Sequence, residues 1–242
     1  MKRILKKIFL ILIFTTIVLS FGLFAYIINK IQDKEFYLQS LLIDNDNKIL
    51  KAFFSPDDNL KDILLTLIAC EKKSIKITMY TITEKDIAQA LIDAHKKGIK
   101  VECISDRTYG ADKFSKIPRL ANYAIPIWVY QTEEKNGSLM HNKFVIFEDN
   151  ISNKSIIWTG SYNFTKRAGE ANQENIIIID NQNIFNRYNQ QFDIIKKRSL
   201  LISGDIKETY NYRYDQNKNK KREIDNYIDY IVKQILKFIR YI

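Results

Sequence analysis

The 242-residue sequence is poor in the residues that build metal sites, tight turns and disulfide frameworks. Its two cysteines and two histidines have no spacing typical of a zinc site, so we predict none. Seven glycines, three prolines and the absence of a repeat exclude a collagen-like chain. Cys70 and Cys103 lie in apolar segments and are expected to be buried free thiols; a disulfide between them in an oxidising compartment is the alternative.

The rest of the composition is that of a globular protein with an uneven distribution of charge. Hydrophobic residues make up 46% of the chain and charged residues 27%, which excludes wholesale disorder. A net charge of +10 generally favours a polyanionic partner, either a nucleic acid or an anionic membrane surface. However, residues 1–30 have five basic residues and no acidic one, residues 200–242 have nine against six, and residues 31–199 have 24 against 22. The charge therefore indicates topology more than substrate.

Residues 1–30 are predicted to form a membrane anchor. Ile8–Ile28 is uncharged, follows four cations, and is long enough to cross a hydrocarbon core of about 30 Å. The cations should stay cytoplasmic, which anchors the protein in the inner membrane with its remainder facing the periplasm or exterior. A cleaved signal peptide, followed by secretion, is one alternative, although its apolar region is usually only about 7–15 residues. A buried helix of a soluble protein is the other.

The remaining chain divides into a stalk, a catalytic domain and a tail. Residues 31–47 are polar and mixed and are predicted to be the stalk. In residues 48–199, strand-like and helix-like apolar periods alternate, which predicts an α/β/α sandwich around a mixed β-sheet. The predicted strands are Ile49–Phe54, Ser74–Tyr80, Ile99–Ser105, Ile127–Tyr130, Lys143–Phe147, Ser155–Gly160 and Asn175–Asp180. The predicted helices are Asn59–Lys73, a helix capped by Thr83 and ending near Lys97, part of Arg107–Ala124, and Ile184–Arg198.

The basic tail, residues 200–242, is predicted to end in an amphipathic helix. Apolar residues recur there at three- and four-residue steps: Ile224, Ile228, Ile231, Ile235, Phe238 and Ile242. Such a helix is expected to dock against the domain or a partner subunit. The alternative is that it lies on a membrane surface.

One group of polar residues has the composition of a phosphodiester-cleaving site. His141 and Lys143 stand two residues apart along a predicted strand, so strand alternation places both side chains on one face. An imidazole beside a fixed ammonium supplies a nucleophile and a cation for the non-bridging phosphate oxygens. Ser161 and Asn163 follow the next strand and are placed to bind the same phosphate. Glu174 is expected to accept a hydrogen bond from the far nitrogen of His141.

This pattern resembles the phospholipase D superfamily, whose signature is H-x-K-x4-D followed by G-S-x-N. The corresponding residues here are His141, Lys143 and Glu148, then Gly160, Ser161 and Asn163. The resemblance covers roughly residues 51–198, including Tyr80 and Asp106 at the ends of predicted strands, and is greatest to compact single-motif bacterial members. Glu148 stands where the family has an aspartate, and Asp149 follows it. The resemblance implies that this motif carboxylate is structural and organises the turn after the strand.

The resemblance also implies a mechanism and a set of partners. A family active site needs two copies of the motif, so a single-motif chain should form a homodimer. One His141 would attack phosphorus to give a phosphohistidine, and the partner's His141 would protonate the leaving oxygen, with no metal or other cofactor. Lys143, Ser161 and Asn163 of both chains would bind the phosphate, and Glu174 would orient each imidazole.

Two kinds of phosphodiester remain as candidate substrates. Phospholipids are favoured because an anchor would hold the site near bilayer phosphates. A metal-independent nuclease acting on DNA or RNA is the alternative, since the resemblance extends to compact bacterial nucleases. Two basic patches, Lys113/Lys116/Arg119 and Lys166-Arg167, are candidate seats for a phosphate chain. An inactive, membrane-tethered scaffold is the third interpretation.

Overall fold

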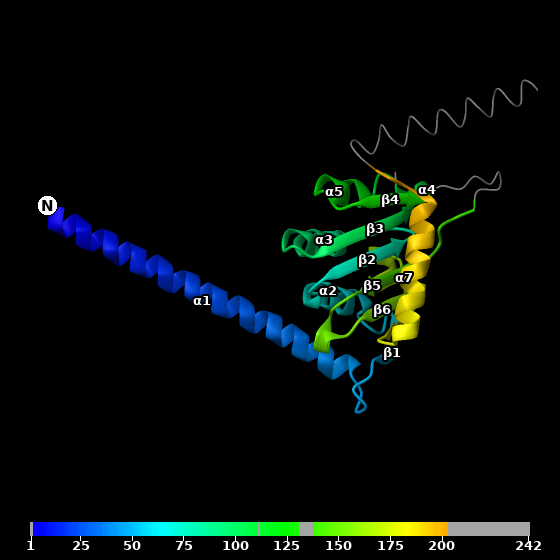
Figure 1. Cartoon of the computed structure of the whole chain (residues 1–242), viewed down its shortest axis with the longest axis horizontal. Helices are drawn as coiled ribbons and strands as arrows, with labels where there is room; N and C mark the ends of the chain where they lie inside the picture. Colours follow the sequence, from blue (N-terminus) through cyan, green and yellow to red (C-terminus); the bar gives the residue numbers. More distant parts are fainter. Residues whose placement is uncertain (1, 111, 131–137, 203–242) are drawn as a thin grey trace, which may run out of the picture.

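The computed structural model describes residues 2–110, 112–130 and 138–202 (Figure 1). Its strands are β1 (Leu50–Ser55), β2 (Ser74–Met79), β3 (Lys100–Asp106), β4 (Ile127–Tyr130), β5 (Lys143–Phe147), β6 (Ile156–Gly160), β7 (Glu174–Ile179) and β8 (Ser199–Leu201). Its helices are α1 (Lys2–Leu42), α2 (Leu60–Cys70), α3 (Lys85–Lys96), α4 (Arg107–Gly110), α5 (Ile117–Asn122), α6 (Lys166–Glu170) and α7 (Gln182–Lys197), with a 3-10 turn, η1 (Ile151–Asn153).

In this described part of the chain, the strands form one eight-stranded sheet in the order β1-β7-β6-β5-β2-β3-β4-β8. The strands β2, β3 and β4 run parallel, and every other neighbouring pair is antiparallel. Figure 1 shows α2, α3 and α5 on one face of the sheet and α7 across the other. The predicted α/β/α sandwich around a mixed sheet is therefore confirmed.

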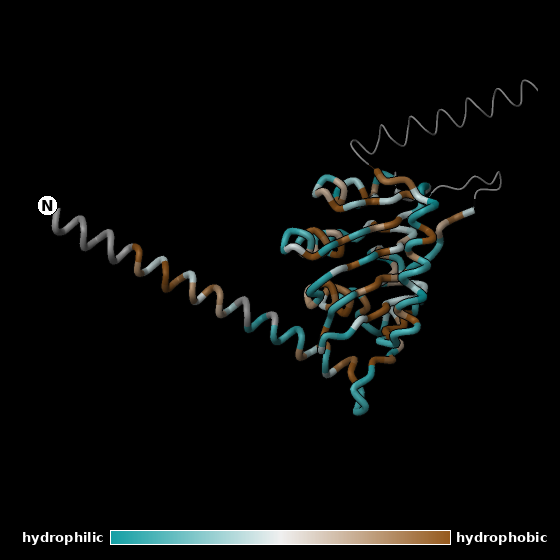
Figure 2. The backbone as a smooth tube through the Cα atoms, in the orientation of Figure 1, coloured by the Kyte–Doolittle hydropathy of each residue, from teal (hydrophilic) through white to brown (hydrophobic). Residues whose placement is uncertain are grey.

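The core lies on both faces of the sheet because successive side chains of a strand point to opposite sides. Ile75, Ile77 and Met79 of β2 belong to the apolar cluster beneath α2 and α3. Ile104 of β3 and Phe144 of β5 belong to a second cluster beneath α7. Figure 2 shows the same division, with hydrophobic residues along the central strands and hydrophilic residues on the outer surfaces of the helices.

The seven predicted strands agree with the structure to within one residue at each end, but several local features differ, among them the short helix α6 and the turn η1, which were not predicted. The short strand β8 was not predicted; it follows α7 and pairs with β4 as the last strand of the sheet. The prediction that Thr83 caps α3 was wrong, because the N-cap is Glu84, whose side chain accepts a hydrogen bond from the backbone N–H of Asp86. The helix itself begins at Lys85.

The N-terminal helix α1 continues through most of the segment predicted as a stalk. Its last turns pack against the domain, since Leu38 and Leu42 are fully buried and Glu35 pairs with Lys72 of the α2–β2 connection at 3.4 Å. Across the described ranges, none of the helices meets the length and apolarity that a membrane crossing requires.

The tail was predicted to contain an amphipathic helix within residues 200–242. Residues 203–242 lie outside the described part of the chain, and so does this helix. The division of the chain into anchor, stalk, catalytic domain and tail stays a prediction.

Both cysteines are free thiols in the interior, as predicted, and do not form the disulfide that was the alternative. Cys70 ends α2 and Cys103 lies in the middle of β3. Burial raises the pKa of the Cys70 thiol to about 11 and that of the Cys103 thiol to about 12. Neither thiol is therefore a reactive thiolate at neutral pH.

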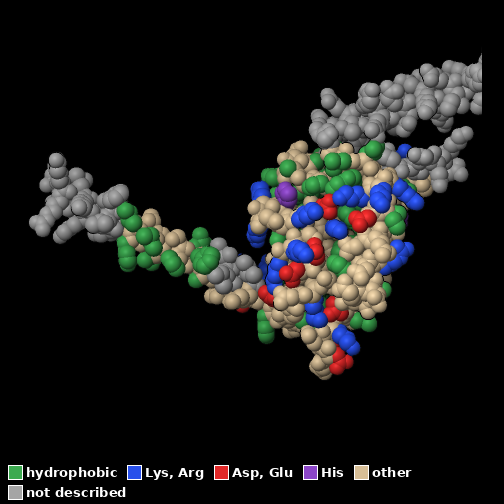
Figure 3. Space-filling model, in the orientation of Figure 1, with side chains coloured by type: hydrophobic (Ala, Val, Ile, Leu, Met, Phe, Trp, Pro, Cys, Tyr) green, Lys and Arg blue, Asp and Glu red, His purple; other side chains and the backbone are tan. Residues whose placement is uncertain are grey.

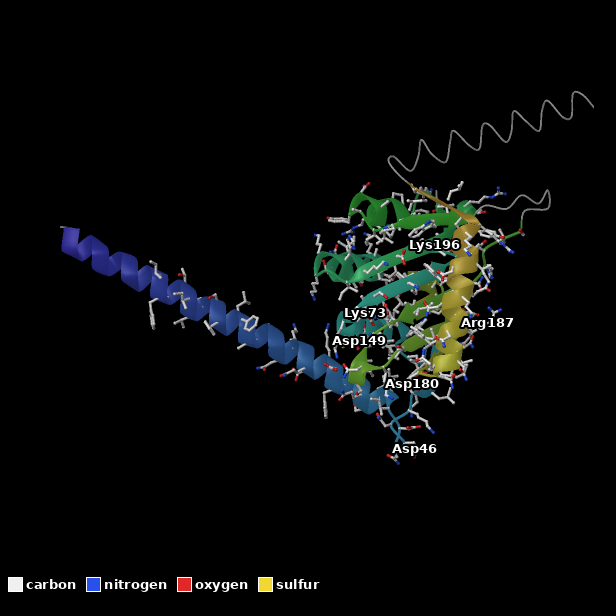
Figure 4. All side chains as sticks on the ribbon, in the orientation of Figure 1. Asp46, Lys73, Asp149, Asp180, Arg187 and Lys196 are labelled. Carbon is white, nitrogen blue, oxygen red and sulfur yellow. The ribbon has the colours of Figure 1, made fainter. Side chains whose placement is uncertain are left out.

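A buried carboxylate, Glu71, joins three segments at one edge of the sheet. Its Oε1 accepts hydrogen bonds from the backbone N–H groups of Lys73 at 3.0 Å, Ser74 at 2.9 Å and Asp149 at 2.9 Å. Its Oε2 accepts a hydrogen bond from the side-chain amide of Asn150 at 3.1 Å. Figure 4 shows Lys73 and Asp149 close together at this edge. One side chain thus fixes the end of α2, the start of β2 and the turn after β5.

Replacing this carboxylate should destabilise the fold. We expect Glu71→Ala to lower the free energy of unfolding by about 3 kcal/mol, because it leaves several buried donors without an acceptor. Glu170→Ala, which removes an exposed ion pair with Lys166, is the matched control and should change it by about 0.5 kcal/mol or less. Chemical denaturation measures both, and equal midpoints for the two variants would contradict the role of Glu71.

Candidate active site

The polar residues singled out in the sequence lie at one edge of the sheet, opposite the Glu71 edge. Because β5 is antiparallel to β2 and β7 is antiparallel to β6, the first residues of β5 and β7 meet the last residues of β2, β3 and β6. The residues at this edge are Tyr80, Asp106, His141, Lys143, Gly160, Ser161 and Glu174. The ends of five strands, β2, β3, β5, β6 and β7, thus converge on one site.

The centre of the site is the contact between Lys143 and His141. The ammonium Nζ of Lys143 lies 3.1 Å from Nδ1 and 3.4 Å from Nε2 of His141. It also donates a hydrogen bond to the carbonyl of His141 at 2.9 Å. Lys143 is buried, with 8% of its surface exposed, whereas His141 faces solvent. The pair therefore presents an accessible imidazole backed by a fixed positive charge.

Tyr80, the residue after β2, packs against this pair. Its ring lies 4.4 Å from the imidazole of His141, centroid to centroid, in an edge arrangement with an interplanar angle of 61°. The ammonium of Lys143 lies 5.4 Å from the centroid of the same ring. Tyr80 thus shields the ammonium from water and limits the orientation of the imidazole. The sequence placed Tyr80 at the end of a strand but assigned it no role.

Asp106 fixes the backbone that carries the histidine. It is buried at the end of β3, and its Oδ2 accepts a hydrogen bond from the backbone N–H of Met140 at 2.9 Å. Its Oδ1 accepts another from the backbone N–H of Thr108 at 2.8 Å. A buried carboxylate that spans two chain segments in this way holds the residue next to His141 in place. The signal in the sequence was a charged residue ending an apolar strand, and its role was not assigned.

The surroundings of His141 favour its neutral, nucleophilic form. Burial and then the positive charge of Lys143 lower the pKa of His141 below its ordinary value, while the negative charge of Asp106 acts in the opposite direction. Burial also lowers the pKa of Lys143, and Glu174 opposes that shift. An imidazole with a lowered pKa stays unprotonated to a more acidic pH than an ordinary one.

The loop after β6 carries Ser161 and Asn163, and Ser161 contacts Glu174 at the site. Gly160 is required at its start, because a Cβ there would lie 2.0 Å from the carbonyl oxygen of Asn175. Ser161 Oγ donates a hydrogen bond to Glu174 at 2.5 Å and accepts one from the backbone N–H of Asn175 at 3.0 Å. The buried Oδ1 of Asn163 has no hydrogen-bond partner among the described residues.

Glu174 holds this loop within the single chain. Its Oε2 accepts the hydrogen bond from Ser161, and its Oε1 accepts one from the side-chain amide of Asn172 at 3.0 Å. The hydrogen bonds of Glu174 in the described part of the chain thus go to these two residues and not to His141. The orienting role of Glu174 toward an imidazole stays a prediction.

The motif carboxylate lies far from the histidine, at the opposite end of β5. Glu148 forms an ion pair with Lys73 at 2.5 Å and accepts a hydrogen bond from Ser74 Oγ at 2.5 Å. These two contacts, Lys73 first, hold the pKa of Glu148 below its ordinary value. Asp149 contributes its backbone N–H to Glu71, as described above. Both residues sit in the turn after β5 and are remote from the reacting centre.

The described residues contain no group of three or more histidine, cysteine, aspartate or glutamate side chains positioned to hold a metal ion. At the site, the ammonium of Lys143 lies beside the imidazole of His141. An ammonium in this position can bind an anion next to a nucleophile, which is the chemistry of phosphodiester cleavage.

Comparison with known proteins agrees with this geometry. Residues 64–196 match the family model described as "Cardiolipin synthase, PLD-like domain". The chain belongs to the phospholipase D superfamily. It is 31% identical over 202 residues to a phospholipase D of Rickettsia conorii, covering 79% of this chain and 96% of that protein. It is 28% identical over 130 residues to a mitochondrial cardiolipin hydrolase of Xenopus tropicalis, covering 54% and 58% of the two chains.

Solved structures of this superfamily share the fold. Nuc from Salmonella typhimurium, a phospholipase D family member, superposes with a TM-score of 0.57 at 26% identity, covering 65% of this chain and 99% of that one. NucT from Helicobacter pylori superposes with a TM-score of 0.58 at 25% identity, covering 64% and 99%. The family resemblance read from the sequence is confirmed, and the chain is a phosphodiesterase of the phospholipase D superfamily.

The site makes a testable prediction about pH. The pKa of His141, followed by NMR, should lie below the ordinary value of about 6.5, so the neutral imidazole persists to lower pH. Lys143→Met should raise this pKa because it removes a neighbouring positive charge, and Asp106→Asn should lower it further. Lys197→Met, at the exposed end of α7, is the control. A pKa that falls in Lys143→Met would refute this account of the site.

Proposed function

We propose that this phosphodiesterase is a membrane-anchored homodimer that hydrolyses phospholipids through a phosphohistidine at His141. The observation that carries the proposal is the buried ammonium of Lys143 held within 3.1 Å of the His141 ring. A cation at that distance neutralises the phosphate oxygens at the point where the imidazole attacks phosphorus. Burial and then this positive charge also lower the pKa of the imidazole, which favours its neutral, nucleophilic form.

The reaction needs two imidazoles, one as the nucleophile and one as the proton donor and acceptor. A ring nitrogen of one neutral His141 forms a bond to phosphorus while the bond from phosphorus to the leaving oxygen breaks, and the partner's His141, in its protonated form, donates a proton to that oxygen. The partner's His141 then removes a proton from water, whose oxygen attacks phosphorus and releases the first histidine. Lys143, Ser161 and Asn163 of both chains bind the phosphate oxygens.

A homodimer follows from the number of imidazoles. Each chain has two histidines, and His95 lies near the end of α3, on a different element from the site. A single site therefore has one imidazole for a reaction that uses two. A two-fold symmetric pair brings both copies of the motif to one phosphate.

Phospholipids are the proposed substrate for three reasons. Residues 1–30 have the composition of an uncleaved inner-membrane anchor, with the catalytic domain facing the periplasm or exterior. Two relatives are named phospholipase D and cardiolipin hydrolase. Residues 31–199 have 24 basic against 22 acidic residues, and Figure 3 shows the two signs interspersed on the face it presents, without a continuous basic stripe.

The test is an activity assay on the full chain reconstituted in phospholipid vesicles, with single-stranded DNA as the competing substrate and EDTA present. We expect phospholipid hydrolysis that EDTA leaves unchanged and that His141→Ala reduces by at least about 10³-fold. His95→Ala, which changes the other histidine, should retain activity.

The other outcomes identify the alternatives. Cleavage of DNA alone would make the protein a nuclease, and cleavage of neither substrate would make it a scaffold. Loss of activity in EDTA would contradict the metal-independent mechanism, and full activity of His141→Ala would contradict the catalytic role of that residue.

A further inference from the structure

A second basic and aromatic surface lies around α5, outside the active site. Phe114 is 60% exposed before this helix and Tyr123 is 41% exposed after it. A lysine ammonium lies over each ring, that of Lys113 at 4.8 Å from the Phe114 centroid and that of Lys96 at 4.5 Å from the Tyr123 centroid. Large exposed aromatic rings flanked by cations are typical of surfaces that contact the interface of a bilayer.

The cations of this segment are not paired with acidic side chains in the part of the chain that the structure describes. Lys113, Lys116 and Arg119 take part in no ion pair there. Lys116 donates a hydrogen bond to the carbonyl of Phe114 at 3.2 Å, and Arg119 hydrogen-bonds the side chain of Gln89. Neither contact neutralises a charge, so three positive groups remain available to an anionic ligand.

The position of this surface matches the direction of the proposed anchor. Figure 1 shows that α1 leaves the domain on the side of the layer formed by α2, α3 and α5, and that α5 lies at the far end of this layer from α1. A bilayer entered by α1 would face the same layer. The surface is also tied to the active-site edge, since the backbone N–H of Lys116 donates to the carbonyl of Ile82 at 2.8 Å, just beyond Tyr80.

We propose that the α5 surface, consisting of Lys113, Phe114, Lys116, Arg119 and Tyr123, docks the domain onto an anionic phospholipid bilayer. The two aromatic rings enter the headgroup region, and the three cations contact lipid phosphates. Together with α1, this surface attaches the domain at two points and fixes the orientation of the active-site edge relative to the bilayer. The inference rests on the membrane anchoring and lipid substrate proposed above.

The experiment uses the full chain reconstituted in vesicles of phosphatidylcholine, with or without phosphatidylglycerol. An environment-sensitive fluorophore is attached to Phe114→Cys, because the native cysteines are buried and label poorly. The matched control is Gln190→Cys on α7, which covers the opposite face of the sheet. We expect the label at 114 to shift to the blue and be quenched by brominated lipids only when phosphatidylglycerol is present. The label at 190 should do neither.

Charge variants of the labelled protein test the cations separately. In the triple variant K113Q/K116Q/R119Q, each lost cation should lower the ratio of docked to undocked protein by about fivefold. The control R187Q/K197Q/R198Q removes the same charge from α7 and the residue that follows it, and should leave docking unchanged. High salt should mimic the first triple variant, because it screens surface charges.

Several results would overturn the proposal. The first is an equal fluorescence response of the label at 114 in vesicles with and without phosphatidylglycerol, and the second is an equal loss of docking in the two triple variants. The others are failure of the chain to float with vesicles, and a fluorescence response of the label to single-stranded DNA in place of lipid. Phospholipid hydrolysis is measured in the same vesicles to separate this proposal from the proposed function. Hydrolysis without docking would reject only the proposal that the α5 surface binds the bilayer. Docking without hydrolysis would reject only the proposed phospholipase activity.

Discussion

The buried ammonium of Lys143 beside His141 is the interaction on which the rest of the site depends. An ammonium that is 8% exposed loses most of its hydration, and its compensation comes from the His141 carbonyl, the face of Tyr80 and the charge of Glu174. Burial and then the same charge lower the pKa of the imidazole next to it. In the mechanism proposed here, one ammonium therefore both binds the phosphate and favours the unprotonated form of the attacking imidazole.

The sheet topology makes this contact available and keeps other carboxylates away from it. Because β5 is antiparallel to β2, its first residue, Lys143, pairs with Met79 next to Tyr80, while its far end reaches the start of β2. The structural carboxylates Glu71 and Glu148 act at that far end, where they bind backbone N–H groups, a hydroxyl and Lys73. An anionic substrate that binds at Lys143 is therefore separated by the length of β5 from the carboxylates of Glu71 and Glu148 at the opposite edge of the sheet.

Local patterns in the sequence predicted most of this fold, and their failures have a common cause. Strand alternation located seven strands because it is set by neighbouring residues, and the order of His141, Lys143, Gly160, Ser161 and Asn163 located the loops of the site. The strand β8 was missed because three residues show no period and its stability comes from pairing with β4. The cap of α3 was misplaced by one residue, because a distant carbonyl positions the chain that enters the helix: that of Phe164 accepts hydrogen bonds from the N–H groups of both Thr83 and the true cap, Glu84. The roles of Tyr80, Asp106 and Glu71 likewise depend on which strand ends the topology brings together.

What a single chain lacks defines what the proposed homodimer has to supply. Among the described residues, His141 faces an ammonium and an aromatic ring, while the hydrogen bonds of Glu174 go to Ser161 and Asn172. No carboxylate in this part of the chain accepts a hydrogen bond from the imidazole. In the proposed dimer, the partner's His141 provides the proton for the leaving oxygen. Dimerisation in this proposal therefore assembles one active site from two copies of the motif.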